Sequence, residues 1–176
     1  SKGKKMTAQY SIPDKAVPYI LFQRTAYLKY THSLLYRALR KVSPFSLYKR
    51  TVHLESCVRG NKIKAMYMDD MTHEYNVIKG DLPENCQSVL DIGCGIAGIN
   101  ILVNQHYKNL DIKFYLLDKS EIENNVFYLF NSKGAFYNSL ELACDTLSTN
   151  GILRKNIIPI VANEKNEIAI DEKIDL

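Results

Sequence analysis

Apolar residues recur at helical spacing through the first half of the chain. Between residues 15 and 42 this spacing predicts one helix, which Pro44 would end. The mixed stretch after Pro44 predicts two shorter helices, over 46–58 and over 69–79, with Gly80 as the stop of the second. The first half of the chain is therefore expected to be helical.

From residue 88 the pattern changes to short apolar runs that alternate with helical stretches, and a polar turn at 81–85 precedes the change. We therefore expect a helical N-terminal region over 1–80 and an α/β domain over 81–176. Strands that alternate with helices predict a mainly parallel sheet with helices on both faces. The expected elements are a strand at 89–92, a helix at 99–107, a strand at 112–117, a helix at 135–149, a strand at 156–161 and the first residues of a fourth strand at 174–176.

Composition and charge exclude little. Hydrophobic residues make up 46% of the chain and charged residues 24%, which is ordinary for a globular protein. The net charge of +4 is too mild to indicate nucleic acid by itself, so that partner is possible but not favoured. The first helix has a basic surface, most simply a solvated one, formed by Lys29, Arg37, Arg40 and Lys41.

No apolar run is long enough to span a membrane, and we expect no membrane partner. The residues before Met6 lead into no apolar stretch and are left out of the fold assignment. No metal site is expected, because the cysteines have no C-x-x-C spacing and no histidine pair completes a zinc pattern. Buried, reduced thiols in a cytoplasmic protein are the favoured interpretation of Cys57, Cys86, Cys94 and Cys144.

A glycine turn follows the first expected strand of the α/β domain. Gly93, Gly95 and Gly98 form G-x-G-x-x-G between a strand and a helix. Such glycines permit a tight turn and a close approach of ligand to backbone, and the pattern occurs in dinucleotide and nucleoside sites alike. Asp91 distinguishes a nucleoside site from a dinucleotide site. Its carboxylate would repel a pyrophosphate and would favour a ligand with positive charge.

The run Asp-Ile-Gly-Cys-Gly-Ile-Ala-Gly from Asp91 resembles motif I of the class I, Rossmann-type S-adenosylmethionine-dependent methyltransferases. The resemblance covers about residues 86–176. It implies a Rossmann-like methyltransferase sheet and S-adenosylmethionine as cofactor. In that family the acidic residue and the glycines frame the methionine part, and Cys94 lies inside the turn that they form.

Two further positions match the family's cofactor site. Asp118 follows Gly98 by twenty residues and closes the second apolar run. The resemblance implies that Asp118 accepts hydrogen bonds from the ribose hydroxyls, although a strand-end carboxylate can also cap the next turn. After the third expected strand, the family often places a polar side chain beside the adenine amino group. Asn163 could fill that role, or it could be an ordinary turn asparagine.

The sequence departs from the family pattern in two respects. Nearly forty residues separate Asp118 from the third expected strand, more than one crossover helix needs. Aromatic residues in this stretch could cover the adenine or the substrate, or could belong to the core of an extra helix: Phe127, Tyr128, Phe130, Phe136 and Tyr137. A complete family sheet has seven strands, whereas the chain reaches only the start of a fourth. We therefore expect a truncated sheet that lacks a C-terminal half or a partner chain.

The leading functional hypothesis is a methyltransferase that acts on a small molecule, such as a sugar or a natural-product hydroxyl, with residues 1–80 as a cover. The alternatives are an RNA methyltransferase and a non-catalytic cofactor-binding or scaffold subunit with the same fold. A general base could assist transfer to a hydroxyl. The residues available for it before the glycine turn are His53, His73, Glu74 and Tyr75, and no catalytic residue is assigned.

Overall fold

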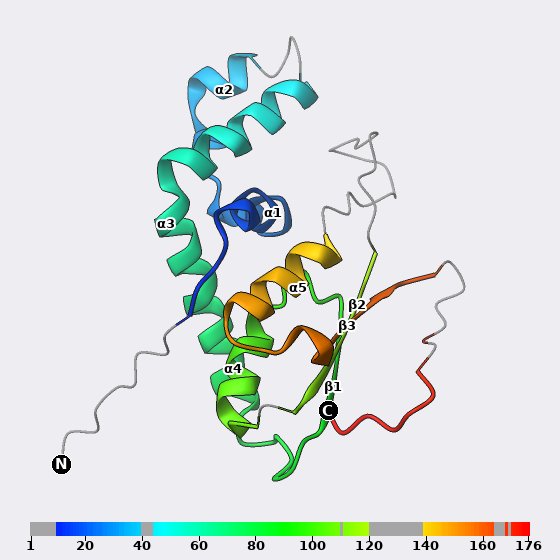
Figure 1. The fold of residues 1–176 in the computed structure, drawn as a ribbon. Helices are drawn as coiled ribbons and strands as arrows, with labels where there is room; N and C mark the ends of the chain where they lie inside the picture. The colour runs from blue at the N-terminus through cyan, green and yellow to red at the C-terminus, as the bar shows by residue number, and fades with distance from the viewer. Residues whose placement is uncertain (1–9, 40–43, 110, 120–138, 164–167, 169) are drawn as a thin grey trace, which may run out of the picture.

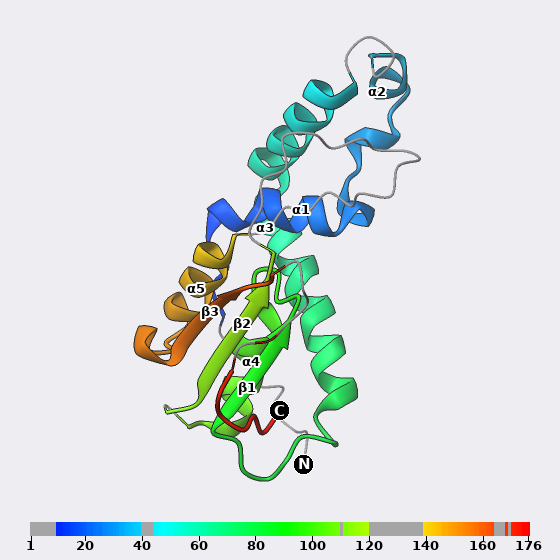
Figure 2. The same ribbon diagram turned by 90° about the vertical axis from the view of Figure 1, so that its right-hand side faces the viewer.

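The computed structural model describes residues 10–39, 44–109, 111–119, 139–163, 168 and 170–176, without the side chains of 44–46. In this part of the chain, helices pack against a parallel sheet and further helices extend away from it (Figures 1 and 2). The helices are α1 (Val17–Gln23), α2 (Leu34–Leu39), α3 (Pro44–Ile78), α4 (Gly98–Tyr107) and α5 (Leu140–Thr149). The strands are β1 (Ser88–Ile92), β2 (Lys113–Asp118) and β3 (Ile157–Val161). Short 3-10 turns occupy Asp14–Ala16, Thr25–Tyr27, Tyr30–His32 and Arg154–Asn156.

The sheet has the order β1-β2-β3, and both strand pairs are parallel, which confirms the expected parallel α/β arrangement. The strands lie within one residue of their predicted bounds. In the register, Asp91 of β1 is opposite Leu116, and Asp118 of β2 is opposite Val161. Because the strands are parallel, their carboxyl ends meet at one edge, which is where ligands bind in open α/β sheets.

The described helices that pack on the sheet lie on one of its faces. Helices α4 and α5 contact each other on one face, where Val89, Phe114 and Leu116 join the core. The opposite face carries no described helix (Figure 2). The C-terminal segment runs there instead, and its Glu172 accepts hydrogen bonds from the hydroxyl of Tyr115 and the ammonium of Lys113.

The last residue of the chain lies along the outer edge of β1. The Leu90 amide donates to the carbonyl of Leu176 at 2.9 Å, and the Leu176 amide donates to the carbonyl of Ser88 at 3.2 Å. One residue bonded to both neighbours of Val89 is the pattern of a parallel bridge. The segment 174–176, expected to begin a fourth strand, is not a regular strand, although Leu176 makes these two hydrogen bonds to β1.

The single helix predicted over 15–42 is wrong, because the chain breaks into α1, two 3-10 turns and α2. Glu55 of α3 stabilises the break. Its fully buried carboxylate accepts hydrogen bonds from the amides of Lys29 (2.8 Å) and Tyr30 (2.6 Å), which an uninterrupted helix would use internally. Arg59 pairs with Glu55 and so compensates the buried charge. Ser33 then caps α2 through its hydroxyl, which accepts the amide hydrogen bond of Tyr36.

The two helices predicted over 46–58 and 69–79 are one helix, α3, and Pro44 begins it rather than ending the helix before it. Proline is tolerated at a first helical position, because its missing N–H would have no partner there. The polar stretch between the two predictions stays helical because its apolar side chains, Ile63, Tyr67 and Met68, are buried against the rest of the protein.

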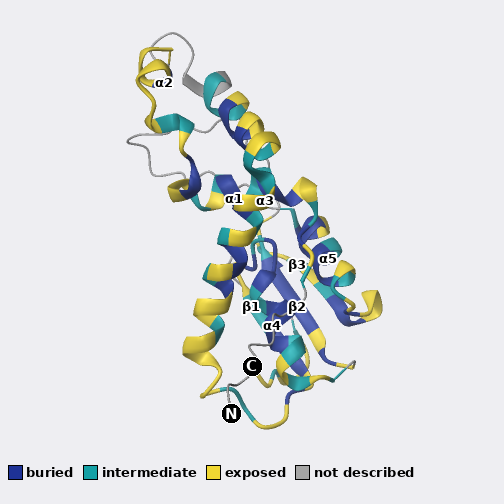
Figure 3. Cartoon of the chain, turned by 90° about the vertical axis from the view of Figure 1, so that its left-hand side faces the viewer, coloured by how far each residue is buried: buried dark blue, intermediate teal, exposed yellow. Residues whose placement is uncertain are grey.

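Most of the buried apolar side chains form one cluster that includes residues from both halves of the chain (Figure 3). Ile20 of α1 and Met68 of α3 belong to the same cluster as Phe114 of β2. Three cysteines are buried as expected, but Cys57 is exposed. None of the described helices combines the length and the apolar character that a membrane crossing requires.

Helix α5 begins at Leu140, where the hydroxyl of Ser139 accepts the Leu142 amide hydrogen bond, and it ends before Asn150 as predicted. The first residues of the helix predicted over 135–149 lie outside the described residues, as do all five aromatic side chains discussed for a lid.

Candidate functional site

The glycine turn connects β1 to α4 at the carboxyl edge of the sheet. Gly93 and Gly95 have φ values of 74° and 56°, in the left-handed region that glycine enters without strain. Ala97, the residue before α4, has a φ of 61° and is completely buried. Cys94 is buried within the turn, as a small apolar residue should be. The turn is therefore tightly wound and faces the core with its non-glycine side chains.

Most amides of the turn donate hydrogen bonds to other groups of the protein. Those of Gly93 and Cys94 donate to the carbonyl of Leu117 (2.7 and 3.4 Å), and that of Ala97 to the carbonyl of Cys94. The Gly95 amide donates to a side-chain carboxylate of β2, and the first amide of α4 donates to a phenol of α3. A phosphate-binding loop needs such amides free to point at the anion. This turn does not offer them.

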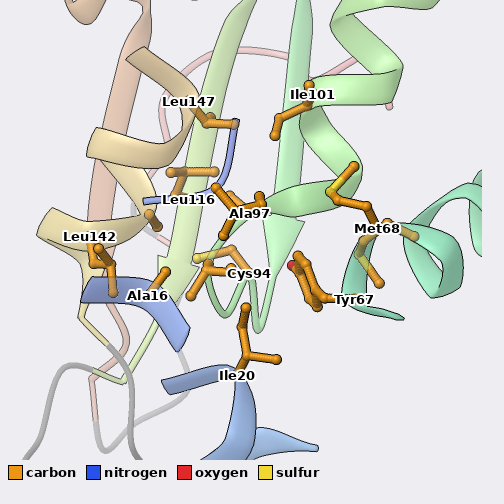
Figure 4. Packing of buried hydrophobic residues seen from close by; sticks show 14 of the residues in the cluster. Ala16, Ile20, Tyr67, Met68, Cys94, Ala97, Ile101, Leu116, Leu142 and Leu147 are labelled. Carbon is orange, nitrogen blue, oxygen red and sulfur yellow. The ribbon is translucent and has the colours of Figure 1, made fainter. Parts of the chain in front are cut away.

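The first amide of α4 is held by Tyr67. Its phenol oxygen accepts the hydrogen bond of Gly98 at 3.1 Å. The ring is 4% exposed, and Figure 4 shows it among the buried apolar side chains. A Cβ atom on Gly98 would lie 2.5 Å from the Tyr67 ring, so only glycine permits this approach. Burial raises the pKa of Tyr67, which therefore stays a neutral phenol at physiological pH.

Asp118, the last residue of β2, joins the turn to the neighbouring strand. One carboxylate oxygen accepts the Gly95 amide hydrogen bond at 2.9 Å, and the other accepts that of Lys119 at 2.7 Å. The capping role considered for Asp118 is thus present. Each carboxylate oxygen has a second lone pair, so these bonds leave room for further donors.

Asp91 lies beneath the turn on the helix-covered face of β1. Its carboxylate accepts a hydrogen bond from the side-chain amide of Asn100 at 2.6 Å. Burial raises the pKa of Asp91, the Asn100 hydrogen bond partly opposes this shift, and the negative charge of Asp118 adds to it. Two carboxylates with the same sign of charge therefore face one turn, and a positive charge placed between them would be stabilised by both.

The end of α1 lies over the turn. A Cβ atom on Gly95 would come within 2.9 Å of the side-chain oxygen of Gln23. The next residue, Arg24, lies 5.5 Å from the centre of the Tyr67 ring and pairs with Asp70 and Glu74 of α3, both at 3.0 Å. These contacts fix the end of α1 against α3 directly above the glycines.

The remaining predicted residues are dispersed. Asn163 is exposed, two residues beyond β3, at the same edge as Asp118. In the part of the chain that the structure describes, the four base candidates make their contacts away from the turn and its carboxylates. Glu74 pairs with Arg24, Tyr75 bonds to His106, and His53 and His73 are exposed on α3.

Sequence reasoning missed Gln23, Tyr67 and Asn100. The sequence did contain a signal for Asn100, because it is a polar residue inside an apolar helical run, where a polar side chain needs a partner. In the structure Asn100 is 1% exposed. Gln23 and Tyr67 had none, since their places depend on how α1 and α3 pack. Family models, curated proteins and solved structures were compared with the chain, and none matches it. What the site binds is therefore inferred from its own geometry.

Proposed function

We propose that this chain binds S-adenosylmethionine at the glycine turn and serves a methyltransferase that acts on a small molecule. One observation carries the proposal: the carboxylates of Asp91 and Asp118 flank a glycine turn whose amides are largely occupied within the protein. Such a site suits a nucleoside with positive charge. It does not suit a dinucleotide, because the pyrophosphate would meet two carboxylates and few free amides.

Different residues would contact different parts of the ligand. Asp118, at the end of β2, is suited to accept hydrogen bonds from the ribose hydroxyls with its remaining lone pairs. Asp91 would stabilise the ammonium and the sulfonium at the methionine end, beside Gly93 and Cys94. Asn163 lies two residues beyond the next strand at the same edge and would be the polar side chain available to the adenine.

The bound cofactor would supply a methyl group activated on a sulfonium. The chain's contribution is to orient the ligand and to exclude water, which is what an in-line displacement requires. Gln23 and the end of α1 lie over Gly95 and narrow the approach to the turn. A covered site favours a small acceptor, such as a sugar or a natural-product hydroxyl, over a polymer. No residue is assigned as a general base.

Isothermal titration calorimetry tests the cofactor part directly. S-adenosylmethionine and S-adenosylhomocysteine are expected to bind, and NAD is expected to give no heat. NAD binding without any response to S-adenosylmethionine would reverse the assignment. For the acceptor, incubation with a methyl-labelled cofactor and a panel of small hydroxyl compounds should label the compounds, whereas labelled RNA would exclude the small-molecule class.

A further inference from the structure

Helix α2 exposes apolar side chains where a surface helix normally exposes polar ones. Leu34, Leu35 and Leu39 are 81%, 71% and 47% exposed. At 100° per residue these leucines and Ala38 cover one arc of roughly 140° on the helix. Tyr36, on the other side, is buried. Figure 3 shows α2 almost entirely exposed at the end of the molecule that is distant from the sheet. The apolar arc therefore faces solvent.

The segment of the chain that carries this arc contains no negative side chain. From residue 15 to residue 54 the sequence has eight Lys and Arg and neither Asp nor Glu. Three cations near the arc are exposed: Lys29 before α2, Arg37 within α2 and Arg50 on α3. Glu55, the first acid after this stretch, adds nothing to the surface because it is buried and paired with Arg59.

The two halves of the chain also differ in charge. Residues 1–80 hold fifteen Lys and Arg against five Asp and Glu, whereas residues 81–176 hold eight against fourteen. The mild net charge of +4 thus conceals a positive N-terminal region and a negative sheet region. Within the positive half, residues 15–54 hold eight of the fifteen cations and no acid, so an anionic surface would attract this segment, which includes α2, more strongly than the rest of the half.

We propose that the segment 29–39, called the tip below, docks on an anionic membrane surface. Its leucines would enter the boundary between headgroups and acyl chains, and its cations would lie among the lipid phosphates. Each Lys or Arg at such a surface strengthens binding about fivefold. A nucleic acid would match the charge but not the leucines, because exposed bases stack on aromatic rings. This departs from the expectation of no membrane partner, which rested on the lack of a membrane-spanning run, because the tip would lie on the membrane surface without crossing it. The role does not depend on the proposed cofactor.

Flotation of the protein with vesicles tests the proposal. Phosphatidylcholine vesicles that contain phosphatidylserine should bind the protein, and vesicles of phosphatidylcholine alone should not. Binding should weaken as salt is raised, since the cations are exposed and screened. Equal binding to both vesicle types, or none to either, would overturn the proposal.

Paired variants distinguish vesicle binding by the tip from effects of net charge or of impaired folding. Leu34→Ser with Leu35→Ser should weaken vesicle binding at least about tenfold, and Arg37→Glu should weaken it more than about fivefold. The matched controls are Val77→Ser and Lys79→Glu at the other end of α3, where both residues are exposed and neither change should matter. Circular dichroism melting should be the same for all four proteins.

Three results would contradict the tip as the docking site. Lys79→Glu could weaken binding as much as Arg37→Glu, which would show that vesicle binding depends only on the net charge of the protein and not on the tip. The leucine variant could bind vesicles as the parent does. Single-stranded RNA could displace the vesicles and bind the leucine variant unchanged, which would assign the tip to nucleic acid instead.

Discussion

The phenol oxygen of Tyr67 accepts the amide hydrogen bond of Gly98 at 3.1 Å, and through it the long helix α3 occupies the first amide of α4. In a phosphate-binding fold that amide would face the ligand. Here a buried side chain takes its place, and Arg24 from α1 lies over the same ring. The glycine turn is thus fixed from the side of the N-terminal helices as well as from the sheet.

Replacing Tyr67 with Phe should lower the free energy of unfolding by about 1–3 kcal/mol, because the Gly98 amide would remain buried without its acceptor. Urea denaturation measures the loss. Tyr75→Phe is the control, since the Tyr75 hydroxyl bonds to His106 at the exposed surface and should contribute less than about 1 kcal/mol. Equal losses in the two variants would show that the Gly98 contact has no special weight.

Gly98→Ala should destabilise the protein by about 1–3 kcal/mol, because the added Cβ would meet the Tyr67 ring at 2.5 Å. Gly80→Ala should stay within about 0.5 kcal/mol, since nothing lies within 4 Å of a Cβ there. The double variant Gly98→Ala with Tyr67→Leu should cost less than the sum of its parts, because the smaller side chain removes the clash. Strict additivity would refute the steric explanation.

Asp118→Ala and Asp91→Asn should affect ligands differently. Loss of the ribose acceptor should weaken S-adenosylmethionine and adenosine alike by about 10- to 150-fold, since hydrogen bonds to a charged group contribute about 1.5–3 kcal/mol. Asp91→Asn should weaken S-adenosylmethionine much more than adenosine, which has neither ammonium nor sulfonium. Calorimetric titration gives all four values. A similar loss of both ligands in Asp91→Asn would mean that this carboxylate does not face the methionine end.

Asp91 should make cofactor binding depend on pH. Burial raises the pKa of this carboxyl in the ligand-free protein, whereas a bound cation would favour its ionised form. S-adenosylmethionine affinity should therefore fall as the pH is lowered through the raised pKa of Asp91, and it should fall less in Asp91→Asn. Adenosine affinity, measured over the same pH range, is the reference. The same pH dependence for both ligands would exclude Asp91 as its source.

The raised pKa also has a consequence for stability without ligand. The folded protein holds the Asp91 proton more tightly than the unfolded chain does, so ionisation of Asp91 works against folding above the folded-state pKa. Asp91→Asn, which can still accept the Asn100 hydrogen bond, should therefore raise the melting temperature at neutral pH and have little effect in acid. A lower melting temperature at neutral pH would contradict this sign.

Glu55→Ala should lower the free energy of unfolding by about 3–5 kcal/mol, because it leaves the guanidinium of Arg59 buried without its partner and removes the acceptor for two amides. Asp14→Ala is the control, since Asp14 pairs with Lys64 but is 96% exposed, and it should cost no more than about 1 kcal/mol. Thermal or urea denaturation compares them. Two small and equal effects would mean that the helix break does not need Glu55.

The sheet half of the fold could be predicted because its signals are local. Each strand is a short apolar run bounded by turns, and Asn150 and Gly151 mark the end of α5 as predicted. The start predicted at 135 missed Ser139, whose hydroxyl caps the helix from Leu140. The positions of Asp91 and Asp118 followed from the same strands, and they lie at the glycine turn as the motif implies.

The helical half could not be predicted from periodicity, because long-range contacts decide it. The break before α2 depends on the carboxylate of Glu55, which lies some twenty-five residues further along the chain. The unbroken α3 depends on burial of Ile63 and Met68 in a stretch that also contains charged residues and a glycine. Likewise, no local pattern indicates that Tyr67 would meet Gly98.

Helix α3 begins just after α2 and reaches past the glycine turn, a length of about 50 Å at 1.5 Å per residue. Its Tyr67 touches the turn, and its Glu55 holds the segment that leads into α2. One continuous helix therefore contacts both regions where we propose ligands. Any partner of α2 that shifts α3 would change affinity at the glycine turn, and the ligand at the turn would change affinity for that partner by the same factor.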